Sequence, residues 1–395
     1  MVEDGRNALP RPPRRLPADA GSLTQLEAPN RPSRPEPPPR GPWIFGRFLA
    51  GLVALLVIVA AGGGAGWYLK QRSLRIDTAA VLGTVKPAVV RVLASSCAGS
   101  GEASGVLIDN GRVLTAESAV EGPMSIVVIA PDGRIRRANL LGTSADGVAV
   151  LQSIGFDDEP LRLPARTPDP KAERALVGYT AAGKQVVNAI GSEHDPKPLS
   201  TVMNTAKLGS PIVDRAGQLV GLVTGRTVEA STIVGVDKLR SYVAQAPSGI
   251  TVATGGSCPL SHGPQTAVVP VMQVANTPQA AEVRQLFGNY LTLLNRQDFA
   301  GLQALYSKKL ARSLTVERDR QSHLTSYFFN PRLTDVTADG YARLSFNVLF
   351  APTAKGAEGG SCNRLDIRYK LARERGKLVI DEAKAMKAPV SCDTD

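Results

Sequence analysis

The residue types that could support metal or redox chemistry are scarce in this chain of 395 residues. It has four cysteines and three histidines, and neither a CxxC nor a CxxH spacing occurs among them. A structural zinc site needs four such ligands, which usually come in closely spaced pairs. We therefore expect no metal site and no cofactor.

A glycine-rich stretch, GSGEASG at 99–105, has the composition of a phosphate-binding loop. It lacks the Lys-Ser/Thr ending whose side chains bind phosphate and magnesium, and it does not open a helical pattern. The stretch therefore predicts a turn that leads into a β-strand.

The charge distribution gives little support to a nucleic-acid-binding function. Lys and Arg number 46 against 35 Asp and Glu, which gives a net charge of +11. The excess is spread along the chain, whereas nucleic-acid-binding domains gather basic residues on one face or stripe. Partners other than nucleic acid are expected.

Two segments at the N-terminal end lack the sequence pattern of a folded domain. Residues 1–47 are rich in Pro and Arg and carry no apolar periodicity, so we predict a disordered tail. Residues 48–69 contain no Asp, Glu, Lys, Arg or His and are long enough to cross a bilayer as a helix. Aromatic residues at both ends of this run, including Trp43 and Trp67, suit the membrane interface.

The basic residues that flank the predicted span favour one orientation. Eight arginines precede the span, whereas only Lys70, Arg72 and Arg75 follow it closely. By the positive-inside rule this predicts a cytoplasmic tail and a single-pass protein of the cell membrane whose bulk is extracytoplasmic. Gly62 and Gly66 have GxxxG spacing, which leaves a homodimer open.

The cysteines all follow the predicted span. An even number of cysteines outside the cytoplasm predicts disulfides, and four cysteines allow three pairings. One bridge for each of the two modules described below would pair Cys97 with Cys258 and Cys362 with Cys392.

Residues 77–250 are built of short runs rich in β-branched residues. Turn signals such as DNG, PDG and DRAG separate these runs, which predicts an antiparallel barrel or sandwich. The runs are PAVVRVLAS, ASGVLID, RVLTAE, MSIVVIA, VAVLQSI, ALVGY, KQVVNAI, SPIVD, QLVGLVTG and STIVGV.

Three motifs in this segment resemble those of the chymotrypsin-like serine proteases, notably the bacterial HtrA type and the membrane-anchored actinobacterial type. They are GSGEASGVLIDNGRVLTAESAV, LLGTSADGVAVLQSI and LGSPIVDRAGQLVGLVTG, in the order that the family shows. The resemblance implies a trypsin-like domain with a double β-barrel over 77–250.

The resemblance places the three catalytic positions of the family on residues that cannot form the usual triad. The histidine falls on Ser118, the aspartate on Gly147 and the nucleophilic serine on Leu208. A serine needs a neighbouring base, and the base needs an orienting group. His194 lies in a turn, and Ser210 lies two residues past the nucleophile position.

From these replacements we expect that the chain is not an enzyme but a degenerate protease homologue with no catalytic residues. In this interpretation the barrel is a non-catalytic scaffold of the cell envelope that binds a peptide or protein partner outside the membrane. The alternative is a membrane-anchored, trypsin-like serine endopeptidase that uses non-standard residues.

A second module follows a linker, predicted over 251–276. Thr277-Pro278 begin an amphipathic helix, a second short helix follows Asp298, and a third is predicted over 316–327. Two hairpins come next, turning at ADG and at ERGK. We therefore predict an α+β module over 277–392.

This module resembles the nuclear-transport-factor-2-like (SnoaL-like) superfamily, whose fold is an α+β cone. The resemblance rests on EVRQLFGNYLTLLNRQDFAGLQALYS and YKLARERGKLVIDEAK. Tyr290, Phe346 and Tyr369 are predicted to face inward, which favours an aromatic core, and His323 is expected at a surface or interface. Binding of a small ligand inside the cone is a further alternative.

Overall fold

The computed structural model describes most of the chain beyond the N-terminal tail. The described residues are 43–109, 111–153, 155, 158–164, 168–245, 258, 260–265 and 268–393. The predicted tail up to residue 42, and residues 251–257, 259, 266 and 267 of the predicted linker, lie outside the described residues. The chain divides after Ala65 into two compact units, which are described separately.

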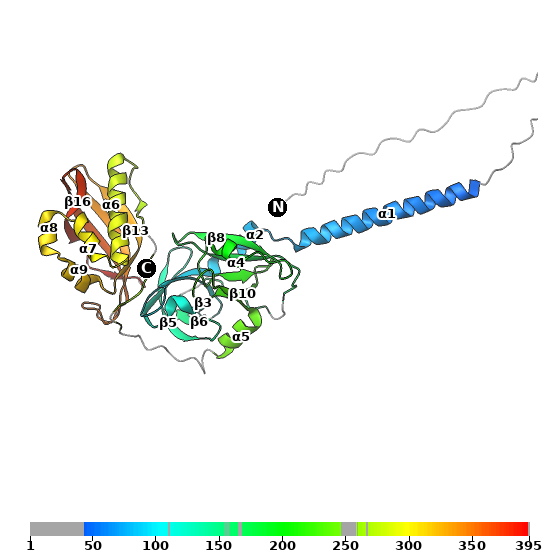
Figure 1. Cartoon of the computed structure of the whole chain (residues 1–395), viewed down its shortest axis with the longest axis horizontal. Helices are drawn as coiled ribbons and strands as arrows, with labels where there is room; N and C mark the ends of the chain where they lie inside the picture. Colours follow the sequence, from blue (N-terminus) through cyan, green and yellow to red (C-terminus); the bar gives the residue numbers. More distant parts are fainter. Residues whose placement is uncertain are drawn as a thin grey trace, which may run out of the picture. The chain divides into compact units, whose positions relative to one another are not determined.

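The first described element is the long helix α1, Trp43–Leu74 (blue in Figure 1). Its stretch Ala50–Lys70 is long and apolar enough to cross a membrane, and none of it is buried inside the structure. The helix extends beyond the predicted span of 48–69 at both ends. It therefore has the properties of a membrane anchor.

A short connection joins α1 to the first barrel. Asp77 caps α2, Thr78–Val85, by accepting hydrogen bonds from the amides of Ala79 and Ala80. Val81 and Val85 of α2 are buried in the barrel core. The 3₁₀ turn η1, Lys86–Ala88, then leads into the first strand.

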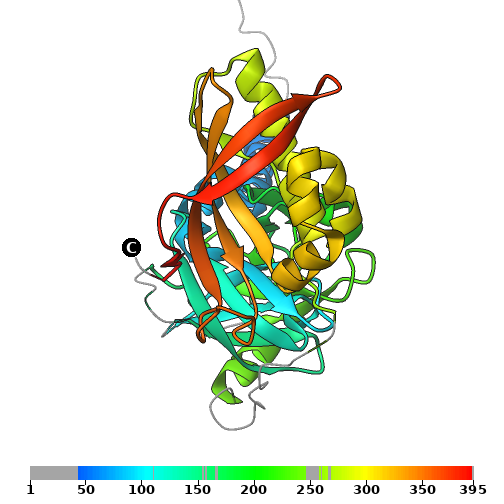
Figure 2. The same ribbon diagram turned by 90° about the vertical axis from the view of Figure 1, so that its left-hand side faces the viewer.

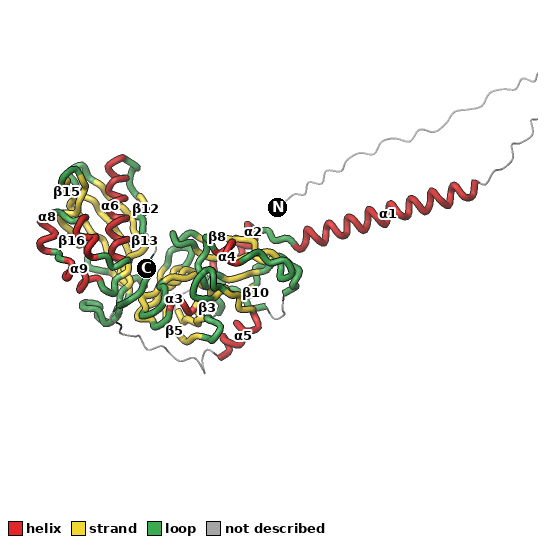
Figure 3. The backbone as a smooth tube through the Cα atoms, in the orientation of Figure 1, coloured by secondary structure: helices red, strands yellow, loops and turns green. Residues whose placement is uncertain are grey.

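Six antiparallel strands close a barrel in the order β1-β2-β3-β6-β5-β4. Figure 3 draws strands in yellow and labels β3 and β5 of this barrel. The six strands are β1 (Val89–Ser96), β2 (Glu102–Leu107), β3 (Arg112–Ala116), β4 (Pro123–Ile129), β5 (Ile135–Thr143) and β6 (Val148–Ser153), with the one-turn helix α3 (Glu117–Val120) after β3. Valine dominates the buried core, as expected for strands packed on an interior. The prediction of an all-β barrel is confirmed for this half.

The second half of the all-β region is a five-stranded sheet in the order β11-β10-β9-β7-β8. Its strands are β7 (Arg174–Tyr179), β8 (Gln185–Gly191), β9 (Pro211–Val213), β10 (Leu219–Thr224) and β11 (Thr232–Gly235), accompanied by α4 (Leu199–Met203) and α5 (Val236–Gln245). We expected a second closed barrel, but within the described residues β8 and β11 do not pair. The open sheet is nevertheless buried. Side chains of β7, β10 and α5 join the core of the first barrel, and others of β7–β10 pack with α4 in a second cluster.

The C-terminal region packs helices on one side of a sheet (Figure 2). The strands are β12 (Val271–Met272), β13 (Tyr327–Val336), β14 (Tyr341–Leu349), β15 (Cys362–Glu374) and β16 (Lys377–Ala385), with β17 (Val390–Ser391) paired to β15. The helices are α6 (Pro278–Asn295), α7 (Phe299–Leu302), α8 (Lys308–Ser313) and α9 (Val316–His323), with the 3₁₀ turn η2 (Gln303–Leu305) after α7. Both predicted hairpins form at the expected turns.

One helix boundary differs from the prediction. The third helix ends at His323, and Tyr327 begins β13 with its side chain fully buried. Tyr327 and Phe329 point away from the helices and join a core cluster with Leu93 and Val127 of the barrel. Tertiary packing against the barrel therefore extends the strand into a segment whose local pattern is helical.

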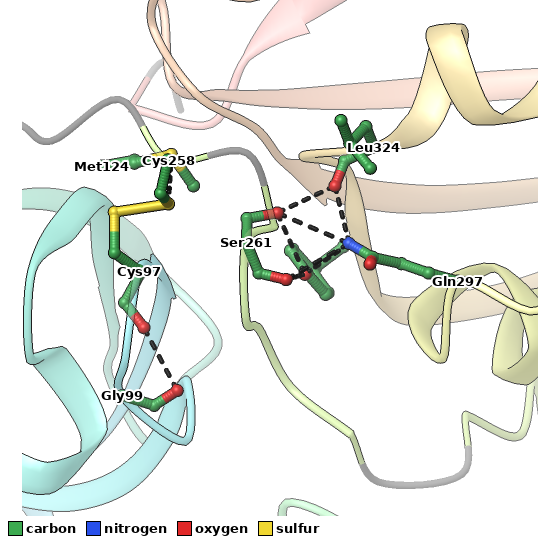
Figure 4. The surroundings of a disulfide bond; sticks show 9 residues. Cys97, Gly99, Met124, Cys258, Ser261, Gln297 and Leu324 are labelled. Carbon is green, nitrogen blue, oxygen red and sulfur yellow. Dashed lines mark hydrogen bonds between the residues drawn. A yellow bond between two sulfur atoms is a disulfide. The ribbon is translucent and has the colours of Figure 1, made fainter.

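The segment between the two modules is fastened at both sides. The structure bonds Cys97 to Cys258 and Cys362 to Cys392, which are the pairs that the one-bridge-per-module argument favoured. Just beyond the first bridge, Ser261 and Gln297 share the carbonyl of Leu324, at 2.8 and 2.6 Å (Figure 4). The segment that follows Cys258 thus joins the barrel on one side and the C-terminal sheet on the other.

Asp319 is a buried carboxyl group whose pKa predicts a pH-dependent stability. It is 2% exposed, and burial raises its pKa to about 6, although Tyr306 and Gln303 donate weak hydrogen bonds to it. Since this pKa lies above that of the unfolded chain, Asp319 stabilises the fold below pH about 4, and this stability is lost as the pH rises through about 6.

We predict that Asp319→Asn raises the free energy of unfolding by about 1 kcal/mol at pH 8 and removes a loss of stability that the unsubstituted chain shows between pH 4 and 8. Urea unfolding of the full chain in a neutral detergent measures both effects. Asp335→Asn, at an exposed carboxylate of β13, is the matched control. Equal effects of the two substitutions would contradict the prediction.

Candidate functional site

The three segments singled out by the sequence meet in the all-β region. The amide of Glu117 on α3 donates a 2.9 Å hydrogen bond to the carbonyl of Gly147, which precedes β6. On the other side, a Cβ added to Gly209 would lie 3.0 Å from the amide nitrogen of Ala116. The fold therefore gathers α3, the turn before β6 and the loop before β9 at one place, where the resemblance puts the catalytic centre.

Ser118 lies on the one-turn helix α3 and is half-buried. Its carbonyl accepts a 2.7 Å hydrogen bond from the amide of Ser100, which fixes the helix to the glycine-rich stretch. Its Oγ is buried, and the described residues provide it with no hydrogen-bond partner. Ser118 therefore carries a hydroxyl that no structural hydrogen bond engages.

Gly147 stands in a tight turn with φ of 76°, a conformation that favours glycine over any residue with a side chain. The carboxylate of the neighbouring Asp146 is bound by two side chains of α5. Lys238 Nζ lies 2.8 Å from Asp146 Oδ1, and the Tyr242 hydroxyl donates to Oδ2. These hydrogen bonds lower the pKa of Asp146 and raise the pKa of Lys238 and Tyr242. Asp146 therefore anchors α5 and does not orient a base.

The loop before β9 turns the Ser210 hydroxyl away from solvent. Ser210 is fully buried, and its Oγ donates a 2.6 Å hydrogen bond to the carbonyl of Lys207. Leu208, at the nucleophile position, accepts a 2.8 Å bond from the amide of Ser104 through its carbonyl. The amide of Gly209 donates to Val223, so this N–H is not free to stabilise an oxyanion.

A buried carboxylate that the sequence analysis missed holds this loop. Glu102 Oε1 lies 2.9 Å from Arg91 Nη2, and Oε2 lies 3.1 Å from Lys207 Nζ, with the Glu102 side chain only 4% exposed. The ion pairs connect β1 and β2 of the barrel to the residue that precedes Leu208. The available signal was a single charged residue between the glycines of GSGEASG, where it begins a fully buried strand.

The three histidines occupy different surroundings. His194 is exposed in the connection between β8 and α4. His323 is half-buried against the edge of the Phe328 ring at 5.8 Å, and burial lowers its pKa to about 4, so it is less exposed than a free surface residue. His262 exchanges two backbone hydrogen bonds with Ser96 of β1, at 2.8 and 2.7 Å. It therefore lies against the barrel, although its sequence position put it outside that module.

The described parts of the chain contain no cluster of side chains suited to bind a metal ion. No group of three or more His, Cys, Asp or Glu side chains gathers there in a geometry that could hold an ion.

Comparison with known proteins connects this region to the serine proteases. Residues 103–222, which include Ser118, Gly147 and Leu208, match the family model described as a trypsin-like peptidase domain. Two curated proteins of Mycobacterium tuberculosis, serine protease MT3772 and serine protease Rv3671c, are each 23% identical over 198 residues, which are 44% of this chain and 50% of the relative. The chain spans about half the length of these curated relatives.

Similar solved structures are also named as proteases. The active form of the Rv3671c protease from M. tuberculosis is 20% identical, with a TM-score of 0.35 over 45% of this chain and 88% of that structure. A serine endoprotease from Yersinia pestis is 24% identical, with a TM-score of 0.37 over 45% of this chain and 69% of that structure.

These comparisons correct the expectation that the chain is not an enzyme. The family model is that of a peptidase, and both curated relatives are named serine proteases. The expectation assumed that nucleophile and base can come only from three aligned positions. Serine hydrolases on several folds place equivalent groups at different chain positions, so replacements at Ser118, Gly147 and Leu208 do not by themselves exclude hydrolysis.

We predict that Glu102→Gln lowers the free energy of unfolding by about 2 kcal/mol, because it leaves two cations around a neutral amide in a largely buried place. Glu121→Gln is the matched control. Its ion pair with Arg226 spans 3.7 Å and is exposed, so it should cost no more than about 0.5 kcal/mol. Urea unfolding at neutral pH measures both, and a loss at Glu102 no greater than at Glu121 would show that the buried pairs do not hold the loop.

Proposed function

We propose that this chain is a membrane-anchored serine peptidase of the trypsin-like type that cleaves peptide bonds outside the cytoplasm. The observation that carries the proposal is the trypsin-like peptidase match over 103–222, on a region whose three candidate segments fold together. The substrate is then the peptide or protein partner expected from the sequence. Ser118, Gly147 and Leu208 occupy the positions of the usual histidine, aspartate and serine. The nucleophile and the base therefore cannot be assigned from these positions alone.

Ser118 is the serine that we propose as nucleophile. It lies among the three gathered segments, and its hydroxyl is not engaged by any described residue. The hydroxyl of Ser210, the other serine near the nucleophile position, is already bonded to the carbonyl of Lys207. The Ser118 Oγ is also buried, but it has no such bond to a described residue. A hydroxyl that is free to bond a base can be activated, whereas one committed to a backbone carbonyl cannot.

His262 is the histidine that we propose as the base. The Cys97–Cys258 bridge and the two bonds to Ser96 hold its segment on β1. The loop over 97–101 leaves the same end of β1. In this loop, the amide of Ser100 donates a hydrogen bond to the carbonyl of Ser118 on α3. His262 is exposed, so its imidazole is accessible from solvent.

The anchor and the disulfides support the proposed location. The stretch Ala50–Lys70 can cross a membrane, and the excess of arginine before it favours a cytoplasmic N-terminus. Two disulfides in the remainder of the chain suit an oxidising compartment. The peptidase region would therefore face the extracytoplasmic side.

For the C-terminal region we propose a nuclear-transport-factor-2-like module with a structural role. Its interior holds packed aromatic rings: Phe287 and Tyr369 have centroids 4.7 Å apart, and Tyr290 lies 6.2 and 6.3 Å from Tyr369 and Tyr306. Burial keeps the pKa of Tyr290 at about 12, so this side chain stays neutral. A filled core of this kind favours packing on the barrel over enclosing a ligand.

A fluorophosphonate probe on the full chain in neutral detergent tests the peptidase proposal. We expect covalent labelling at Ser118, located by mass spectrometry of proteolytic fragments. Ser118→Ala should abolish labelling, whereas the matched control Ser210→Ala should keep it. His262→Ala should slow labelling by about 100-fold, the effect of losing a general base.

Each departure from this pattern contradicts a defined part of the proposal. No labelling of the unsubstituted chain would contradict the serine peptidase assignment. Labelling that survives Ser118→Ala would contradict the choice of nucleophile, and an unchanged rate in His262→Ala would contradict the choice of base.

A further inference from the structure

A cleft lies where the β4–β5 turn of the barrel meets the C-terminal sheet. Two adjoining cavities, of about 300 and 210 Å³, share Gly133, Asn330 and Arg332 in their walls. The larger cavity is also lined by Ser345, Asn347 and Arg364. The walls thus come from the turn on one side and from three neighbouring strands, β13, β14 and β15, on the other.

Strand register explains why these polar side chains share a face. Arg332 pairs with Ser345, and Asn347 pairs with Arg364. Because Leu333, Leu344 and Phe346 pack into the core on the helix side, their sequence neighbours on each strand point to the opposite side of the sheet. This is the side on which Phe329, Leu349 and Cys362 pack against the barrel. The cleft therefore begins where that apolar contact ends.

The cleft carries positive charge that no described residue compensates. Arg332 and Arg364 are exposed. Their backbones belong to the strand ladder, but neither guanidinium group has a hydrogen bond or ion pair to a described residue. The nearby carboxylates are already bound: Asp366 pairs with Arg343, and Asp132 pairs with Arg134. No carboxylate is among the described residues that line either cavity.

Additional donors surround the two free guanidinium groups. Ser345 is half-buried and Asn347 is buried, both on the wall between Arg332 and Arg364. Asn330 adopts a left-handed backbone with φ of 50° at the register shift of β13, which bends the strand at the point that both cavities share. Arg91 lines the smaller cavity. Its Nη2 is paired with Glu102, and its Nε has no hydrogen-bond partner among the described residues.

We propose that this cleft is a binding site for a small polyanion that bears phosphate or carboxylate groups. Guanidinium groups form paired, charge-assisted hydrogen bonds with both kinds of group, and amide and hydroxyl side chains can complete the ligand's coordination. A cavity of this volume accepts a small molecule and not a folded partner. This site is separate from the segments gathered around Ser118, and its occupation does not require peptidase activity.

Calorimetric titration of the full chain in neutral detergent tests the site, with pyrophosphate and citrate as separate probes at matched ionic strength. We expect saturable binding of at least one probe. Arg332→Ala and Arg364→Ala should each weaken that binding by about tenfold, the effect of losing one charge-assisted pair. The probe that binds more tightly identifies whether phosphate or carboxylate groups are preferred.

Arg312→Ala is the matched control, because Arg312 is an exposed arginine of α8 with no partner among the described residues and lies outside the cleft. It should leave binding unchanged. Arg332→Gln and Arg364→Gln, which keep most of the side-chain volume, should weaken binding as the alanine variants do. Absence of saturable binding for both probes, or equal weakening in Arg312→Ala, would overturn the proposal.

Discussion

The ion pairs of Glu102 are the interaction on which the candidate site depends most. This carboxylate is buried at the start of β2, where it pairs with Arg91 of β1 and with Lys207 of the loop before β9. It thereby connects the closed barrel to the second sheet directly beside Leu208. A buried carboxylate is costly unless it is paired, so the loop has little freedom to leave this arrangement. The positions of Leu208, Gly209 and Ser210 relative to α3 follow from that constraint.

A second constraint is the continuous packing between the barrel and the C-terminal sheet. Leu93 and Val127 of the barrel pack with Tyr327 and Phe329 of β13. The Cys97–Cys258 bridge and the bonds of Ser96 with His262 add covalent and backbone connections at one side of this contact. As a result, a histidine that follows the barrel in sequence comes to lie on its first strand, and a polar cleft forms at the edge of the apolar contact.

The sequence predicted the elements that have strong local patterns and missed those that depend on distant contacts. Ten β-branched runs correspond to strands, but β5 was not among them, because arginines at 136 and 137 interrupt its apolar residues. Its alternation of buried and exposed positions appears only once β4 and β6 pair with it. The C-terminal end of the helix predicted over 316–327 likewise depends on tertiary packing, as do the open second sheet and the place of His262. The alignment located Ser118, Gly147 and Leu208 in the right neighbourhood, yet it could not show which hydroxyl lacks a partner.

The central claim is that a trypsin-like scaffold with replaced triad positions still hydrolyses peptides. Such chemistry requires a free hydroxyl, a base and access for an extended substrate, and it does not require those groups at fixed sequence positions. The most direct measurement is digestion of a mixed peptide library by the full chain in neutral detergent, with products identified by mass spectrometry. The account predicts new peptide ends that accumulate with time at recurring sequence contexts. A library that remains intact, under conditions in which a control protease cleaves it, would contradict the claim.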